Sequence, residues 1–383
     1  MSSNCPKPLT LFTKKQLLYN SLNNSNSVNE RTKKLNLSYI VRNAASAGIS
    51  RKTREALTFC AFTNNILLFG GEFNADGTFT EKFVFDPNNI ITGWNIDIQL
   101  NVSRNYLSGT TFNNKIYAIG GENFISNSKL NSIEIYDSIN NPTWVIPQST
   151  FFMNFSRSHH DNIVFGDFIY VIGGQTLLNN SVSFINEIER FNGTSFTLLD
   201  DSYNLKNGVG DNFAQKRCEH SLVTFTFQNK NRIFLIGGVD DSNNNLDTVY
   251  YLNEEITNPE GLRWWKHSVM KNDNNNPIPR RGAASVVYED VLYVIGGATT
   301  NTGKTPTNTV IYLEKNTTDW KVGTSCIFKR FGGRAIVFNG LLYVFGGSTN
   351  ETEYFDGTSW NITQSTNISH TNFPGAGLIT ISR

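Results

Sequence analysis

The octapeptide DFIYVIGG, residues 167–174, is one of six related segments that recur along this chain of 383 residues. Each segment is a short apolar run that ends in a pair of glycines, and most carry an aromatic residue three positions before the first glycine. A repeat of about 50 residues predicts one repeat architecture in place of several unrelated domains. The other segments are NNILLFGG (64–71), NKIYAIGG (114–121), NRIFLIGG (231–238), DVLYVIGG (290–297) and GLLYVFGG (340–347).

Each glycine pair belongs to the same larger unit. An arginine opens the apolar segment before it, and a polar loop of variable length follows it. A further apolar segment then ends in an aromatic residue or Leu followed by a polar residue, as in Tyr136-Asp137, and a Trp or Phe comes soon after. Apolar segments bounded by Gly, Asn and Asp predict four β-strands in each unit, and helical periodicity is nearly absent. We therefore expect an all-β fold.

These units resemble the kelch repeat, whose copies fold as the blades of a β-propeller. The resemblance covers residues 52–368 and rests on six concordant repeats. Glycines at the end of the second strand permit close approach of another backbone, and the Tyr and Trp rings are expected to fill the wedge between blades. The resemblance implies a single kelch-type β-propeller domain over residues 1–383.

The number of blades is open between seven and six. The last clear repeat is expected to finish near Ser369, and residues 370–383 then resemble another first strand. The segment KKQLLYNSLNN, within residues 1–50, resembles a second strand that has lost its glycines. We favour seven blades, with 1–50 and 370–383 jointly forming the closing blade, because such pairing removes exposed strand edges. The alternative is six blades with two appended tails.

The repeated arginines are the candidate ligand-binding residues. Repeat symmetry places them around one mouth of the central channel, and in some kelch propellers that bind acidic peptides the matching arginines contact the ligand. Guanidinium groups stay charged and grip carboxylates with two hydrogen bonds. Alternatively, these arginines are structural and bond neighbouring carbonyls or carboxylates. The resemblance thus implies ligand contact by Arg54, Arg104, Arg157, Arg217, Arg280 and Arg330, with Arg281 beside them.

The remaining polar residues predict no catalytic or metal site and no cofactor. The cluster His159, His160 and Asp161, with His220 at the place equivalent to His160, is interpreted as part of the kelch pattern. The four cysteines lack the CxxC or CxxH spacing of a zinc site or a redox pair. The loops after the glycine pairs differ in every unit and are expected to project at the same mouth as the arginines, where recognition commonly resides.

Charge and hydropathy exclude further classes of partner. The net charge is +1, so no overall field attracts nucleic acid. No apolar run approaches the roughly 18–20 residues of a membrane helix, and no signal peptide is recognisable. We expect a cytoplasmic, monomeric protein.

Two functions stay open from the sequence. The first is a non-catalytic module that binds a protein or acidic peptide through the arginine-lined mouth and the loops. The alternative is an enzyme acting on a small sugar acid, since some stand-alone kelch propellers resemble sialic-acid mutarotases or epimerases. There the arginines would hold the carboxylate, and Glu72, Glu122 or Glu219 would act as base. A pocket with Glu or His beside several arginines would favour the enzyme, and a broad arginine mouth would favour the binding module.

Overall fold

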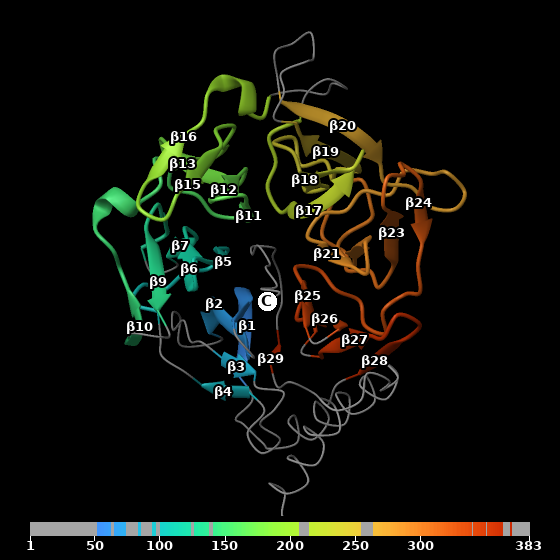
Figure 1. Ribbon diagram of the computed structural model, residues 1–383, viewed down its shortest axis with the longest axis horizontal. Helices are drawn as coiled ribbons and strands as arrows, with labels where there is room; N and C mark the ends of the chain where they lie inside the picture. Colours follow the sequence, from blue (N-terminus) through green and yellow to red (C-terminus); the bar gives the residue numbers. More distant parts are fainter. Residues whose placement is uncertain are drawn as a thin grey trace, which may run out of the picture.

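A ring of blades around a central axis forms the molecule (Figure 1). The computed structural model describes residues 52–369, with gaps at 63–64, 74–82, 86–93, 97–99, 124–125, 138–140, 207–213, 254–262, 339, 350 and 363–367. Within these residues there are six sheets of four or five strands, together with two short hairpins. The predicted all-β propeller is confirmed.

The strands of each blade follow one another outward from the axis in chain order, and consecutive strands pair antiparallel. The first three blades comprise β1 (Lys52–Phe62), β2 (Asn65–Phe73), β3 (Phe83–Phe85) and β4 (Trp94–Ile96); β5 (Ser108–Phe112), β6 (Lys115–Ile119), β9 (Ile133–Asp137) and β10 (Asn141–Val145); and β11 (Asp161–Phe165), β12 (Phe168–Ile172), β15 (Glu189–Phe191) and β16 (Phe196–Leu198). The last three comprise β17 (Ser221–Phe227), β18 (Lys230–Ile236), β19 (Thr248–Leu252) and β20 (Trp264–Val269); β21 (Ala284–Tyr288), β22 (Val291–Ile295), β23 (Val310–Glu314) and β24 (Trp320–Val322); and β25 (Arg334–Phe338), β26 (Leu341–Phe345), β27 (Glu353–Phe355) and β28 (Trp360–Ile362).

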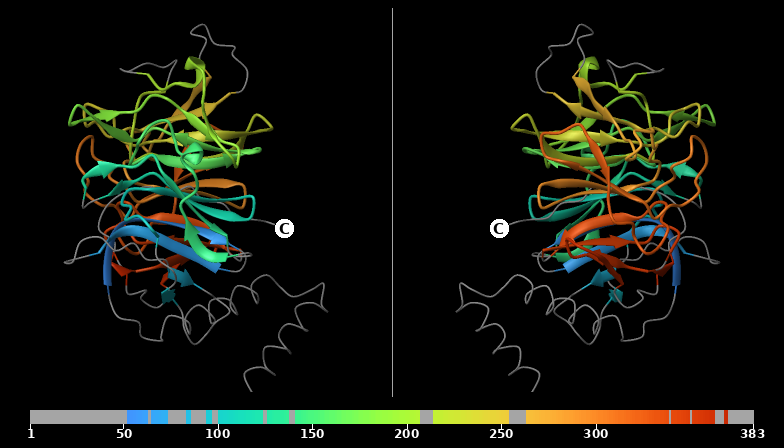
Figure 2. Two further views of the ribbon diagram at one scale, coloured as in Figure 1. Left: turned by 90° about the vertical axis from the view of Figure 1, so that its left-hand side faces the viewer. Right: turned by 90° about the vertical axis from the view of Figure 1, so that its right-hand side faces the viewer.

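Two hairpins stand outside the blades, each directly after a glycine pair. They are β7 (Glu122–Asn123) with β8 (Ser128–Lys129), and β13 (Gln175–Leu178) with β14 (Ser181–Phe184). Figure 2 shows the same ring of blades from two sides. Short 3-10 helices at Ser149–Phe151 and Asp201–Tyr203 complete the described elements.

The closure of the ring corrects one expectation. The sixth blade ends with β28, so residues 368–369 do not extend its outer strand; instead β29 (Ile368–Ser369) pairs in parallel with β1 of the first blade. The innermost strand of the sixth blade, β25, contacts both β21 and β1. The proposed closing blade, residues 1–50 and 370–383, lies outside the described residues, so seven blades are not confirmed and remain a prediction.

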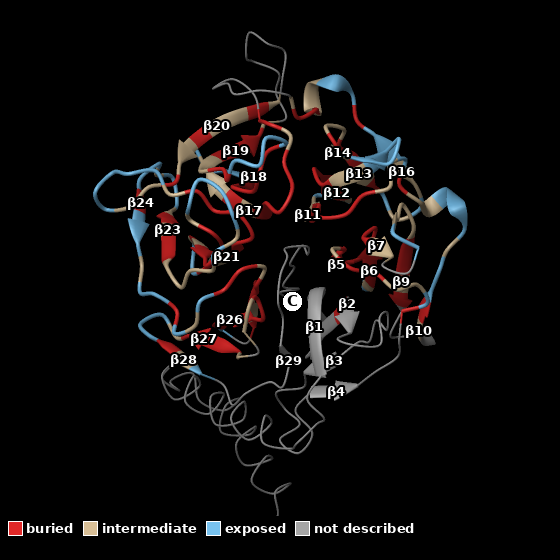
Figure 3. Ribbon diagram, turned by 180° about the vertical axis from the view of Figure 1, so that it is seen from behind, coloured by how far each residue is buried: buried red, intermediate tan, exposed pale blue. Residues whose placement is uncertain are grey.

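The core lies between neighbouring blades, where buried strands line the ring (Figure 3). The tryptophans after the third strands fill these wedges, and each can bury about 150–250 Å². Two of their indole N–H groups donate to the preceding blade: Trp264 to the carbonyl oxygen of Tyr203 at 2.8 Å, and Trp320 to Ser268 Oγ at 2.9 Å. The structural role expected for these aromatics is confirmed.

Candidate functional site

The predicted ligand-binding arginines lie inside the blades. Those of the second to sixth blades are 0–1% exposed. Each donates from Nη1 to the carbonyl oxygen of the first glycine in its own blade's pair, as Arg104 does to Gly120 at 2.8 Å and Arg217 to Gly237 at 2.9 Å. Arg54 lies in β1, and its side chain is outside the described residues. The other three pairs are Arg157–Gly173, Arg280–Gly296 and Arg330–Gly346.

A glutamate on the third strand completes the contact in three blades. Glu353 accepts from Nε and Nη2 of Arg330 at 3.1 and 2.7 Å. It also accepts from the backbone N–H groups of Ile327 and Phe328, at 2.6 and 3.1 Å, in the chain that enters the blade. In the second and third blades Glu134 accepts from Nε of Arg104 at 3.0 Å and Glu189 from Nη2 of Arg157 at 2.8 Å, and each also accepts from two backbone N–H groups of the chain that enters its blade. We name each such arginine and glutamate pair a blade clasp.

The fourth and fifth blades lack this glutamate and carry Tyr250 and Ile311 at its place. The guanidinium of Arg217 lies over the Tyr250 ring, 5.3 Å from its centroid. Arg280 reaches Thr309 Oγ1 at 2.8 Å, while its Nε and Nη2 have no hydrogen-bond partner among the described residues. Burial lowers the pKa of both arginines to about 10.

These contacts give the five described arginines the structural role that the sequence left open. A buried guanidinium needs partners because its charge has lost water, and each blade supplies them from its own carbonyls, hydroxyls, ring or carboxylate. Contact with an outside ligand stays an untested prediction for them, and their burial speaks against it.

We expect the arginines with and without a glutamate to differ in stability measurements. Arg330→Met leaves the buried Glu353 carboxylate without its cationic partner and is expected to cost about 3–5 kcal/mol of unfolding free energy. Arg280→Met leaves no buried carboxylate unpaired and removes a guanidinium with two unpartnered nitrogens. Its loss of unfolding free energy is therefore expected to be below about 2 kcal/mol. Urea denaturation of both variants measures the difference, and equal costs would contradict it.

A run of backbone hydrogen bonds links the second to the sixth blades at the channel mouth. From the third to the sixth blade, the residue two positions after the arginine donates its N–H to the carbonyl oxygen of the equivalent residue in the preceding blade, at 2.8–3.0 Å. All have positive φ, between 50° and 77°. This conformation turns the chain so that neighbouring blades meet edge to edge. We name these residues the collar: Tyr106, His159, Glu219, Gly282 and Gly332.

Charged and aromatic side chains meet at the collar. Glu219 accepts from Nε and Nη2 of Arg281, at 2.5 and 3.1 Å, and lies 3.3 Å from Lys304 Nζ. The Tyr106 and His159 rings stack with centroids 3.9 Å apart. The Lys304 side chain is 36% exposed, whereas that of Glu219 is 3% exposed. We name these five residues the mouth cluster.

Loops after the glycine pairs contribute to this region, as expected. Gln175 bonds His159 Nδ1 at 3.0 Å, and Asn243 Oδ1 accepts from Arg281 at 2.9 Å. Lys304 itself stands in such a loop, and Glu122 pairs with Lys129 in the hairpin β7–β8. Residues from four blades therefore converge on one surface of mixed charge.

Burial and nearby charges at the mouth shift the pKa values of His159 and Cys218 so that both side chains stay uncharged. Burial, followed by the positive charges of Lys129 and Lys304, holds the pKa of His159 well below its usual value. Burial, reinforced by Glu219, raises the pKa of the neighbouring Cys218 thiol well above its usual value. At neutral pH the imidazole is uncharged and Cys218 is a thiol, so Cys218 is a poor nucleophile.

The sequence identified part of this cluster. Arg281, Glu219 and His159 were singled out, although in different roles, whereas Tyr106 and Lys304 were missed. The signal for Tyr106 was its position two residues after an arginine, shared with His159 and Glu219. The signal for the clasp glutamates was their place two residues before the aromatic that ends the third strand. The side chain of Glu72 is outside the described residues.

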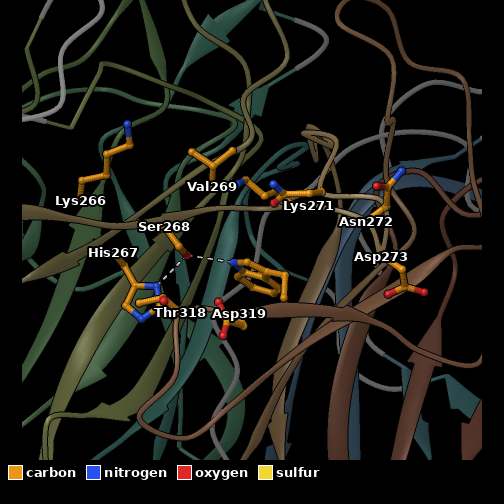
Figure 4. Close-up of a pocket in the computed structure, with 11 residues that line it drawn as sticks. Lys266, His267, Ser268, Val269, Lys271, Asn272, Asp273, Thr318 and Asp319 are labelled. Carbon is orange, nitrogen blue, oxygen red and sulfur yellow. Dashed lines mark hydrogen bonds between the residues drawn. The ribbon is translucent and has the colours of Figure 1, made fainter.

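A separate groove of about 720 Å³ lies on the outer rim between the fourth and fifth blades (Figure 4). At its floor Ser268 Oγ contacts His267 Nδ1 at 2.7 Å and accepts from the Trp320 indole. These bonds join the two blades and give the groove's polar floor a packing role. Among the described residues, no group of His, Cys, Asp or Glu is placed to hold a metal ion. No described helix is long and apolar enough to cross a bilayer.

Comparison with known proteins agrees with the architecture. The family model described as Attractin/LZTR1 beta-propeller matches residues 116–366, more than half of the chain. No curated protein matches the sequence. A solved structure described as "Structure of YjhT" aligns with a TM-score of 0.61 at 15% sequence identity, covering 83% of this chain and 99% of that one. At this identity the likeness shows the fold alone.

Proposed function

This chain belongs to the Attractin/LZTR1 beta-propeller family, and we propose that it is a non-catalytic interaction module that binds an acidic segment of a partner protein at the mouth cluster. One observation carries the proposal: Arg281 and Lys304 converge on a single carboxylate, that of Glu219. The same two cations are suited to an acidic side chain from outside, because charge-assisted bonds to carboxylates are among the stronger hydrogen bonds.

The surroundings of the cluster fit a protein partner. The hairpin β13–β14 begins at Gln175, which bonds His159, and exposes Leu178 and Val182 by 62% and 57%. Exposed apolar side chains beside a polar site are typical of interaction surfaces. We therefore expect a ligand segment that carries an acidic residue close to an apolar one.

An enzyme acting on a small sugar acid is the second candidate. The observation that favours it is a carboxylate, an arginine, a lysine and a neutral histidine in one cluster, since acid–base chemistry needs such groups within reach of a substrate. In that case Arg281 and Lys304 would hold the substrate carboxylate, and Glu219 would exchange the proton.

The variant Glu219→Gln separates the two candidate functions, because the binding module predicts a gain of function and the enzyme predicts a loss. In the binding module it removes an internal competitor for both cations, so affinity for an acidic peptide is expected to rise about tenfold, or about 1.4 kcal/mol. In the enzyme it removes the base, so turnover of a sugar acid is expected to fall about 10²–10⁴-fold. Calorimetric titration with acidic peptides and NMR exchange spectroscopy of sugar acids measure these quantities.

Two further variants serve as controls. Arg281→Gln should abolish peptide binding, while Lys321→Gln removes a cation from the exposed pair with Glu314 and should leave binding unchanged. The interaction proposal at this site is rejected if acidic peptides bind neither the native protein nor Glu219→Gln.

A further inference from the structure

The residue three positions after each described arginine packs against a glycine pair where two blades meet. His160 shows the geometry of this position. A Cβ added to Gly174 in the third blade would lie 2.7 Å from His160 Cβ, and one added to Gly120 in the second blade would lie 2.8 Å from His160 Cε1. The imidazole therefore spans the junction of the two blades. We name the residues at this position the wedge residues: Leu107, His160, His220, Ala283 and Gly333.

The third blade has a histidine wedge at each of its two junctions. His220 repeats the geometry toward the fourth blade, because its Cε1 lies 2.6 Å from the position of a Cβ on Gly173 and its Cβ lies 2.9 Å from that of a Cβ on Gly238. His160 and His220 are 1% and 2% exposed. Leucine, alanine and glycine hold the equivalent position in other blades, so a junction does not need an imidazole to close.

The surroundings of His160 disfavour its protonated form. Its Nε2 bonds Ser108 Oγ of the second blade at 2.8 Å. The charges that act on it come from Arg157 in its own blade and from His220 in the fourth, and both oppose a further positive charge. Burial has the largest effect and, together with these charges, holds the pKa of His160 well below its usual value, although the carbonyl group of Ile119 offsets part of the shift.

His220 has a similar environment. Burial, followed by the positive charges of Arg217 in its own blade and Arg334 in the sixth, lowers the pKa of His220 to about 3, with a partial offset from the carbonyl group of Ile172. A protonated imidazole at either junction is therefore a buried cation among other cations, which is a costly arrangement.

The two carboxylates beside these histidines in the sequence have partners of their own. Asp161 accepts from the backbone N–H of Leu222 at 2.9 Å. Glu219 accepts from Arg281 and lies 3.3 Å from Lys304 Nζ. Both carboxylates are thus engaged in other contacts of the ring and do not pair with the wedge histidines.

The closed junctions of the third blade lose stability in acid. Where a junction opens, water reaches the imidazole and its pKa returns to about 6.5, whereas the pKa of His220 in the closed junction is about 3. Above pH 6.5 both forms are uncharged and the closed junction keeps its full stability. As the pH falls from 6.5 toward 3, the open form binds a proton that the closed form excludes. Each histidine then favours the open form by up to about tenfold per pH unit.

The collar bonds that cross these two junctions also position the mouth cluster. The His159 N–H donates to the carbonyl oxygen of Tyr106 across the first junction, and the Glu219 N–H donates to that of His159 across the second, both at 3.0 Å. Tyr106, His159 and Glu219 are themselves members of the mouth cluster. Opening of either junction therefore separates side chains that the cluster brings together.

We propose that the third blade is an acid-sensitive switch, in which protonation of His160 and His220 opens its two junctions and releases the partner held at the mouth cluster. The release rests on the proposed function, whereas the opening of the junctions does not. The two parts therefore need separate measurements.

Hydrogen exchange of the unliganded full chain, followed by mass spectrometry at pH 7.0 and pH 5.0, measures the opening. After correction for the intrinsic exchange rate, we expect protection of the His159 and Glu219 amides to fall about 25-fold at pH 5.0. The Gly332 amide donates to Gly282 across a junction whose wedge residue is Gly333, so its protection should stay constant. An equal change at all three amides, or no change at any, would overturn the proposal.

Leucine variants assign the effect to the two histidines, since Leu107 already fills this position in the second blade. His160→Leu should remove the pH dependence of the His159 amide and leave that of the Glu219 amide, and His220→Leu should do the reverse. His267→Leu removes a buried histidine outside the junctions and should leave both dependences unchanged. An unaltered pH dependence in both junction variants would reject the switch. The comparison with Gly332 needs no variant and stands if these do not fold.

Calorimetric titration with acidic peptides at the same two pH values measures the release. Peptide carboxylates stay mostly ionised at pH 5.0, because their pKa is close to 4. We expect affinity to fall at least tenfold from pH 7.0 to pH 5.0 in the native protein, and less than twofold in the variant that carries both His160→Leu and His220→Leu. Equal losses in the two proteins would reject the release. Absence of peptide binding at pH 7.0 would reject the proposed function and the release with it, while the exchange measurement still decides the opening.

Discussion

Glu189→Ala is expected to lower the free energy of unfolding by about 3–5 kcal/mol, because it leaves a buried cation without its carboxylate partner. Glu189 is fully buried in the third blade and accepts from Arg157 Nη2 at 2.8 Å. It also accepts from the backbone N–H groups of Asn154 and Phe155, at 2.6 and 3.2 Å. With the Asn154 side-chain amide, which also donates to Glu189 at 2.8 Å, the alanine removes the acceptor of four donors at once, and the cavity that it leaves is too enclosed to restore their hydration.

Urea denaturation followed by tryptophan fluorescence measures this loss, with Glu314→Ala as the matched control. Glu314 pairs with Lys321 at 2.7 Å, but both side chains are 47% exposed, so this variant is expected to cost less than about 1 kcal/mol. If the two alanine variants were equally stable, the blade clasps would not hold the blades together and their arginines would again be available as binding residues.

The propeller could be predicted from the sequence because the same short sequence pattern marks the same local structure in each blade. A glycine pair after an apolar run marks the same close approach in each blade, and the Trp after the third strand marks the same wedge. The end of the chain was harder to predict, because Ile368–Ser369 pairs with a strand more than 300 residues earlier, and no local pattern records such a pairing.

The role of the arginines could not be predicted for a different reason. Repeat symmetry fixes where their backbone lies but not which way the side chain turns. Only three of the five blades with a described arginine side chain carry the partner glutamate, namely Glu134, Glu189 and Glu353. The glutamate therefore does not stand out as a motif.

The mouth cluster depends on loops whose lengths differ between blades. Lys304 reaches Glu219 from a loop of the fifth blade, and nothing in either segment alone indicates that contact. The collar is equally hidden, because three of its five residues adopt positive φ without being glycine: Tyr106, His159 and Glu219. The hydrogen bonds between neighbouring blades support this conformation, and those bonds form only where two blades pack together.

Gly237→Ala is expected to destabilise the protein by about 3–5 kcal/mol, through backbone strain and a direct clash. Gly237 has φ of 58°, and a Cβ there would lie 2.1 Å from the carbonyl oxygen of Arg280 in the next blade. Its own carbonyl accepts from Arg217 at 2.9 Å, so a shift of the chain to relieve the clash would also disturb that bond.

Gly166→Ala isolates the clash from the strain. Gly166 has φ of 57°, nearly the same as Gly237, but nothing lies within 4 Å of the position that its Cβ would take. Its cost is therefore expected to be about 1–2 kcal/mol, the strain of a left-handed residue alone. Thermal and urea unfolding of both variants give the difference, which we attribute to the contact between the fourth and fifth blades. Equal losses would mean that the blades separate enough to admit a methyl group, and that the glycine pair serves chain conformation and not blade packing.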